Sequence, residues 1–178
     1  MTTKNEQTHT ISILVENHFG VLARVSGLFS ARGYNIDSLC VGETENPEIS
    51  RMTVTVRGSE NVLNQIIKQL NKLVDVIEVQ DLTQSAFVER ELVMVKVKAD
   101  RKTRAEVVEI SNIFRARVVD VGTHAMIIMI TGAKSKVEAF IDMMKAFGII
   151  EVVRTGTIAI ERCGSNGYNI SPNTENDD

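Results

Sequence analysis

Apolar and polar residues alternate in the first part of the chain and then change to helical spacing. Residues 10–16 (TISILVE) alternate and are rich in branched side chains, which predicts a strand. Residues 20–33 predict an amphipathic helix. The apolar positions at helical spacing in it are Val21, Leu22, Val25, Leu28 and Phe29.

The pattern then returns to strands. Residues 35–43 and 50–57 predict two strands, separated by a loop that contains Pro47. Apolar and polar residues alternate in the second of them, which is typical of an antiparallel strand with one buried face. Ser59 is a suitable N-cap for a second helix, and a strand at 74–82 closes a β-α-β-β-α-β order.

The same order repeats in the second half of the chain. Strands are predicted at 91–99, 117–122, 124–132 and 149–162, the last one interrupted at Gly156, and helices at 102–116 and 134–148. The repeat predicts an α+β fold of two ferredoxin-like βαββαβ domains in tandem. The expected boundaries are 1–9 for a flexible N-terminus, 10–83 for the first domain, 84–90 for a linker, 91–162 for the second domain and 163–178 for a disordered tail.

The composition argues against nucleic-acid binding and against a membrane span. The 178 residues are 43% hydrophobic and carry a net charge of −3, so we expect no nucleic-acid partner, and no run reaches the ~18 apolar residues of a membrane span. RNA-recognition modules share the βαββαβ order, but strand 50–57 has no aromatic residue on which a base could stack. Cys40 and Cys163 form neither a disulfide framework nor a metal motif, which indicates a reduced compartment, by default the cytoplasm.

Candidate catalytic chemistry is absent from the sequence. His9, His18 and His124 are scattered without metal-ligand spacing, and no nucleophile elbow or phosphate-binding loop occurs. We therefore predict neither a metal site nor a catalytic residue. A small ferredoxin-like enzyme stays as an alternative, which turnover by the purified chain alone would support.

Glycines in the first helical segment are its unusual feature, because each internal glycine costs a helix roughly 1 kcal/mol relative to alanine. Gly33 suits the left-handed residue that ends a helix. Gly20 stands where the loop enters the helix, and helix N-termini attract small anions such as carboxylates. Nearby Asn17 can cap the helix or hold a ligand.

Small residues also form a stripe on this helix, because Gly20, Ala23, Gly27 and Ala31 share one helical face. Such a stripe lets another backbone approach closely. The neighbour is either the domain's own sheet or helix, or the same helix in a second copy of the chain with ligand sites in the seam. Spacing alone leaves both interpretations open.

The segment ENHFGVLARVSGLFSARGYNIDSL (16–39) resembles the N-terminal ACT domain of the acetohydroxyacid (acetolactate) synthase regulatory, or small, subunit family. The resemblance continues through SRMT (50–53) and LNKLVDV (70–76). Further motifs resemble the family's C-terminal domain, and together the motifs cover about residues 10–162. They are RELVMVKV (90–97), IFR (113–115), VDV (119–121), FGI (147–149) with Glu151, and RTG (154–156).

The resemblance implies a regulatory subunit without catalytic activity of its own. Such subunits bind the catalytic (large) subunit, raise its activity and confer feedback inhibition by branched-chain amino acids, chiefly valine. It implies that this chain binds no cofactor, and that thiamine diphosphate, Mg and FAD belong to the catalytic partner. The alternative is a stand-alone ACT amino-acid sensor that acts on another enzyme.

The resemblance also implies where the effector binds. ACT domains of the family pair side by side into a homodimer, with effectors at the interface. Asn17 and Gly20 would hold the amino acid's polar end, and Asn35 and Ile36 would come from the partner chain. The residues expected to line or shape the loop are His18, Phe19, Val21 and Leu22.

Two further expectations follow from the resemblance. Phe19 stands where relatives often have proline or a small residue, which bears on effector preference. The corresponding loop of the second domain, ADRKTRAE (99–106), lacks the Asn-x-x-Gly pattern, so no second effector site is expected there. Apart from the resemblance, the exposed side of the first domain, with Arg51, Thr53 and Thr55, is a candidate contact with the catalytic subunit; the alternative is that these residues face water.

Overall fold

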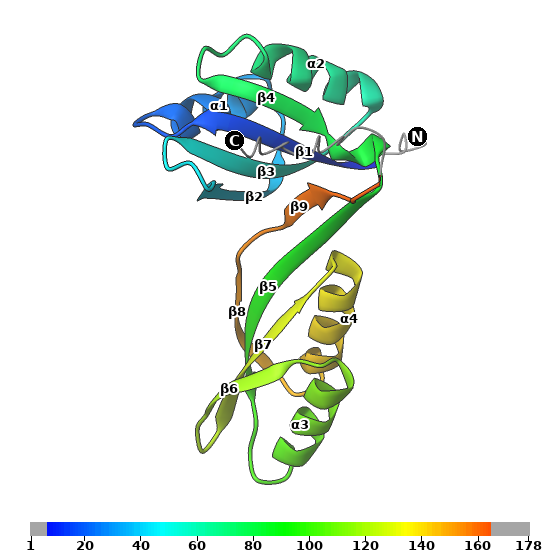
Figure 1. The fold of residues 1–178 in the computed structure, drawn as a ribbon. Coiled ribbons are helices and arrows are strands. Elements are labelled where there is room, and N and C mark those ends of the chain that lie inside the picture. The colour runs from blue at the N-terminus through cyan, green and yellow to red at the C-terminus, as the bar shows by residue number, and fades with distance from the viewer. Residues whose placement is uncertain (1–6, 165–178) are drawn as a thin grey trace, which may run out of the picture.

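The computed structural model of the chain describes residues 7–164, which form two domains stacked end to end (Figure 1). The first domain is a four-stranded antiparallel sheet, in the order β2-β3-β1-β4, with two helices. Its elements are β1 (Gln7–Glu16), α1 (Val21–Ala31), β2 (Ile36–Glu43), β3 (Ile49–Gly58), α2 (Glu60–Leu70) and β4 (Val76–Asp81).

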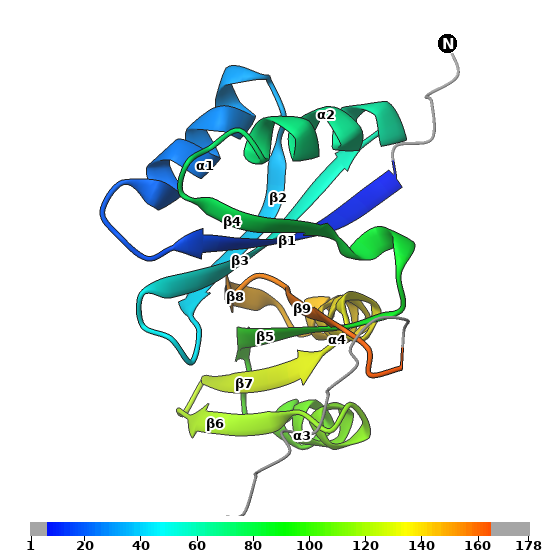
Figure 2. The same ribbon diagram turned by 45° about the horizontal axis from the view of Figure 1, so that its top comes forward.

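Both helices cover the same face of this sheet (Figure 2). The alternation in β1 turns Ile11, Ile13 and Val15 toward the helices, where they pack with Phe29 of α1 and Ile66 of α2 in one buried cluster. The period-2 pattern of the strand and the 3.6 period of the helices therefore meet in a single core.

Helix α1 ends as its glycine predicts. Gly33 has φ +70°, its N–H donates to Ser30 O, and the N–H of Tyr34 donates to Phe29 O. This pair of bonds is the Schellman arrangement, which requires a left-handed residue at this place. The prediction that Gly33 has a structural role is confirmed.

The second domain repeats the architecture with a core of its own, so the predicted fold class is confirmed. Its main sheet has the order β6-β7-β5-β8, and α3 and α4 cover one face of it (Figure 1). The elements are β5 (Phe87–Lys98), α3 (Arg104–Ile113), β6 (Arg117–Val121), β7 (Ala125–Gly132), α4 (Lys134–Lys145), β8 (Ile149–Arg154) and β9 (Ile158–Glu161).

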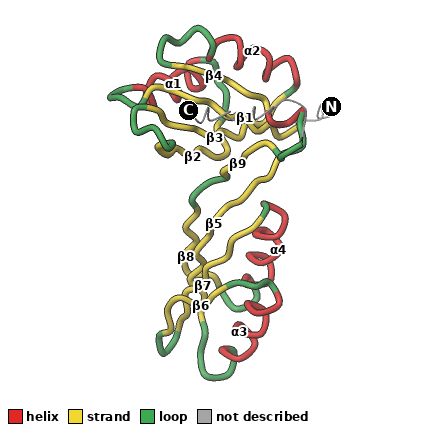
Figure 3. The backbone as a smooth tube through the Cα atoms, in the orientation of Figure 1, coloured by secondary structure: helices red, strands yellow, loops and turns green. Residues whose placement is uncertain are grey.

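The predicted linker 84–90 is wrong for residues 87–90. These residues belong to β5 and pair with β9 in antiparallel register. Gly156, with φ +83°, breaks the last predicted strand into β8 and β9, so that β9 can run along the start of β5 (Figure 3). The short 3-10 helix Leu82–Gln84 and residues 85–86 are what connects β4 to β5.

The ends of the described chain are also more ordered than expected. Residues 7–9 belong to β1 rather than to a flexible N-terminus, and His9 is buried with Nε2 3.1 Å from Gly58 O. Cys163 is exposed just after β9. The rest of the expected N-terminal segment (1–6) and of the tail (165–178) lies outside the described residues. No helix within 7–164 is long and apolar enough to cross a membrane.

The polar face of the first sheet is covered by the second domain. Thr53 and Thr55 of β3 are buried, so the expectation that they form an exposed surface is wrong. The start of β5 and β9 lie against this face (Figure 2), where Ala159 is buried and Gln80 Nε2 donates to Glu161 Oε2 at 2.8 Å. Alternation alone marks a face as polar but cannot show that another domain covers it.

Candidate functional site

The loop between β1 and α1, residues 17–20, carries one half of the expected effector site. The backbone N–H of Asn17 donates to Glu48 O at 2.7 Å. Its side-chain Nδ2 donates to Pro47 O at 2.8 Å and to Glu43 Oε1 at 3.2 Å. Because both amide hydrogens are used within the chain, Oδ1 is the atom of Asn17 that can accept a hydrogen bond from a ligand.

Gly20 is the residue immediately before α1 and has a left-handed backbone, with φ +89°. A β-carbon added there would have no neighbour within 4 Å, so the start of the helix is open on this side. The first turn of a helix has N–H groups without intrahelical partners, and no side chain caps α1. A small carboxylate can therefore reach donors and a partial positive charge at this end of α1.

The neighbouring loop residues divide into exposed and buried ones. Phe19 is 100% exposed and Leu22 is 43% exposed. Val21 is only 3% exposed and packs in the core, and its backbone N–H donates to His18 O at 3.4 Å. The expectation that these residues line or shape the loop stays a prediction, in which the buried Val21 side chain shapes the loop from the core and does not line it.

The other expected half of the site lies at the far end of α1. Asn35 is exposed and donates from Nδ2 to Asp37 Oδ1 at 3.2 Å, and Ile36 is half-buried against the core. An α-helix rises about 1.5 Å per residue, so the 11 residues of α1 hold the two halves about 16 Å apart. One chain alone does not bring them together.

The stripe of small residues faces outward. Ala23, Gly27 and Ala31 are exposed, and a β-carbon added to Gly27 would meet nothing within 4 Å. Packing of this stripe against the domain's own sheet or second helix is therefore excluded. The other interpretation, contact with the same helix in a second copy, stays a prediction.

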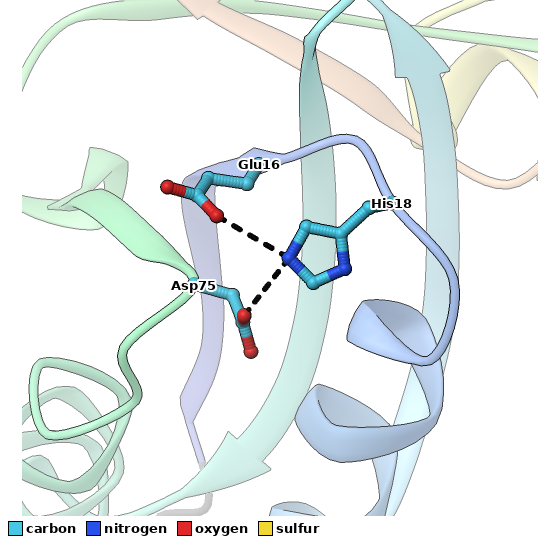
Figure 4. A group of neighbouring side chains, drawn as sticks. All are labelled: Glu16, His18 and Asp75. Carbon is cyan, nitrogen blue, oxygen red and sulfur yellow. Dashed lines mark ion pairs between the residues drawn. The ribbon is translucent and has the colours of Figure 1, made fainter.

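A charged cluster that no sequence motif predicts joins the loop of residues 17–20 to the start of β4 (Figure 4). His18 Nε2 lies 3.2 Å from Glu16 Oε2 and 3.1 Å from Asp75 Oδ1, and Arg24 Nε lies 2.7 Å from the other oxygen of Asp75. Asp75 O also accepts from the Glu16 N–H at 2.9 Å. The buried carboxylate of Asp75 thus joins the loop, α1 and the start of β4.

The same cluster has the composition of a cation site, because ligand atoms of Glu16, His18 and Asp75 lie within 4.8 Å of one another. The Arg24 guanidinium already occupies one side of Asp75, however, and pairs with it. Ion pairing therefore accounts for the cluster without a metal, and the absence of a metal site stays a prediction. The sequence signal that could have located the charged cluster is the carboxylate of Asp75 inside the apolar run LVDV (73–76).

A groove of about 570 Å³ lies beside the loop and includes Asn17 and His18 in its lining. Ile49 and Ile77 contribute apolar side chains to its lining, together with Pro47 and Glu48. Asn17 and His18 therefore adjoin apolar surface that suits the aliphatic side chain of a ligand.

A second, polar cavity of about 300 Å³ lies between the two domains. Thr10, Ser38 and Thr55 line it from the first domain, and Glu91 and Arg154 from the second. Glu91 is only 6% exposed, and burial raises the pKa of its carboxyl against the opposing effect of Arg154, 3.6 Å away.

We expect Glu91→Gln to gain stability relative to the wild type as the pH rises. The raised pKa means that the folded chain binds the Glu91 proton more tightly than the unfolded chain does. The wild type therefore loses stability as the pH rises from the ordinary pKa of a glutamate through the raised pKa of Glu91. A glutamine side chain does not titrate, so the variant does not lose stability in this way. Urea unfolding of both proteins at about pH 4 and about pH 7 measures the difference. A difference that is independent of pH would contradict this, and Glu151→Gln, at an exposed position of β8, is the control.

Comparisons with known proteins agree with this architecture. Residues 11–78 match the family described as the AHAS small subunit-like ACT domain, and residues 90–163 match the family described as the small subunit of acetolactate synthase. The two matched ranges follow the two structural domains.

Individual relatives match over nearly the same range. The "Probable acetolactate synthase small subunit" of Archaeoglobus fulgidus is 54% identical over 154 residues, covering 86% of this chain and 96% of its own length. The acetolactate synthase small subunit of Mycolicibacterium smegmatis is 48% identical, covering 87% of this chain and 91% of its own. A crystal structure of the small subunit from Thermotoga maritima has a TM-score of 0.81 at 41% identity and covers 88% of this chain and 98% of its own.

Proposed function

Because the chain belongs to the acetolactate synthase small-subunit family, we propose that it regulates the catalytic subunit of that enzyme. It raises the rate at which the catalytic subunit forms acetolactate, and it makes that rate sensitive to valine or a related branched-chain amino acid. The observation that carries the proposal is the open start of α1 at Gly20, beside the anchored loop.

The chemistry of the loop suits an α-amino acid. The ligand carboxylate binds the free N–H groups at the start of α1, where Gly20 leaves room. Its ammonium donates to Asn17 Oδ1, which is the acceptor left after both amide hydrogens are used. An aliphatic side chain then adjoins apolar surface such as that of Leu22.

A homodimer completes the site. The exposed stripe of Ala23, Gly27 and Ala31 allows close approach of α1 from a second copy. That approach brings Asn35 and Ile36 of the second copy to the loop of the first, which one chain cannot do over the length of α1. Effector binding and dimer contact then depend on the same helix.

Regulation requires that valine bind one state of the complex better than the other. We propose that the regulatory chain has no turnover and no cofactor of its own, and that thiamine diphosphate, Mg and FAD stay with the catalytic subunit. The place of action is the cytoplasm.

The test is acetolactate formation by the matching catalytic subunit, with and without this chain, and each with and without about 1–10 mM valine, a range that allows for a weak effector site. We expect the chain to stimulate the rate and valine to reverse the stimulation. Stimulation without a valine effect would remove the effector assignment. No stimulation at all would remove the regulatory role with this enzyme.

A further inference from the structure

Direct contact between the two domains occurs close to the second half of the effector site. The N–H of Thr157 donates to Ser38 Oγ at 2.9 Å, across the domain boundary. Ser38 lies in β2, two residues after Ile36. The hydrogen bond therefore joins the second domain to the strand that begins at the expected effector residues.

Gly156 makes this approach possible. A β-carbon added to it would lie 2.9 Å from Ser38 Oγ and 3.2 Å from the backbone oxygen of Leu39, and its φ is +83°. A backbone atom cannot move aside as the end of a flexible side chain can. Glycine is thus required here both for its conformation and for the close contact.

The residues on either side of this contact are bonded to other elements of their own domains. Asp37 pairs with Arg57 of β3 and accepts from Asn35. On the other side, Thr155 N donates to Leu92 O at 3.1 Å, and Arg154 pairs with Glu138 of α4 at 2.8 Å. A shift of β2 is therefore passed to residues that are fixed to the β5 strand and the α4 helix.

A cavity separates the two domains beside this contact. The polar cavity of about 300 Å³ adjoins the contact and has Ser38, Gly156 and Thr157 in its lining. Interfaces between domains that are polar rather than apolar commonly permit relative motion. The Ser38 contact is a direct link at the edge of this cavity, separate from the contact of β9 with the first sheet, where Gln80 donates to Glu161.

We propose that the contact of Gly156 and Thr157 with Ser38, here called the interdomain contact, transmits effector binding from the ACT domain to the second domain. The proposal rests on the proposed function, because it concerns the regulation of the same site. Effector bound at Asn35 and Ile36 changes the position of β2, and the Thr157–Ser38 hydrogen bond makes the second domain follow. Loss of the contact separates effector binding from inhibition.

The test uses the holoenzyme reconstituted with Gly156→Ala. We expect the valine concentration for half-maximal inhibition to rise at least about tenfold, or inhibition to be lost, since allosteric couplings are typically about 5–150-fold. The dissociation constant of valine for the regulatory chain, measured by calorimetry, should stay within about threefold of the wild-type value. A change of that size is smaller than a typical allosteric coupling. Ser38→Ala, which removes only the acceptor of the Thr157 N–H, should act in the same direction without backbone strain.

Gly148→Ala is the matched control. Gly148 also has a positive φ, +91°, but the atoms nearest to a β-carbon there belong to the Lys98 side chain of the same domain. It should therefore show comparable backbone strain and normal inhibition.

Normal inhibition in both Gly156→Ala and Ser38→Ala would overturn the proposal, as would loss of valine binding together with inhibition. A wild-type chain that neither stimulates the catalytic subunit nor binds valine would instead show that the proposed function has failed.

Discussion

Gly20→Asp is expected to abolish inhibition by valine while the chain still activates the catalytic subunit. The new carboxylate would occupy the place of the ligand carboxylate at the start of α1, and the open space around Gly20 admits it. Two like charges about 4 Å apart repel by about 1 kcal/mol in water and about 4 kcal/mol near a protein surface, which weakens binding roughly 5- to 1000-fold. Acetolactate assays over a valine titration measure the loss.

Gly20→Asn is the matched control for this variant. Asparagine has nearly the shape of aspartate, tolerates the left-handed backbone at φ +89° and can cap the helix in the same way, but it carries no charge. Valine inhibition should therefore be weakened much less. If the two variants behave alike, steric hindrance or backbone strain acts at Gly20, and the assignment of the carboxylate position is wrong.

The sequence predicted the fold because each element carries a local signal. The alternation of β1 and the helical spacing of Val25 and Phe29 are set by which face is buried, and both cores formed where these patterns meet. Gly33 and Gly156 marked a helix end and a strand interruption, since glycine is favoured wherever φ is positive. These features depend on residues close together in the chain.

The features that sequence reasoning missed depend on residues far apart. The pairing of residues 87–90 with β9 follows from the direction in which Gly156 turns the chain, which no local pattern specifies. Burial of Thr53 and Thr55 follows from the position of the second domain. Asp75 meets His18 and Arg24 only because β4 lies beside β1 in the sheet.

In the candidate site too, features set by neighbouring residues could be predicted, and features set by distant residues could not. Gly20 was found because a glycine at a helix start has a chemical meaning by itself. That Asn17 has its donors engaged, leaving Oδ1 to accept, required the positions of Glu43 and Pro47. The resemblance supplied Asn35 and Ile36, and the length of α1 is the reason why the proposed site takes them from a second copy rather than from the same chain.

Each domain has its own hydrophobic core. We therefore expect the substitutions that cost most stability to lie inside a domain rather than at the boundary between the two. We expect Phe140→Ala to lower the free energy of unfolding by about 3–5 kcal/mol, the usual cost of removing a buried phenylalanine ring. Phe140 of α4 is fully buried and meets Phe114 edge to face, with ring centroids 5.5 Å apart. Urea unfolding followed by circular dichroism measures the change.

Phe19→Ala is the matched control for this prediction, because the same ring is removed from a side chain that is 100% exposed. Its stability should stay within about 0.5 kcal/mol of the wild type. Similar losses in the two variants would mean that Phe19 is covered in solution, as it would be if the second copy or another partner packs on the effector loop. A small loss for Phe140→Ala would instead show that the second domain's core relaxes to fill the cavity, and that its packing contributes less than the burial of Phe140 implies.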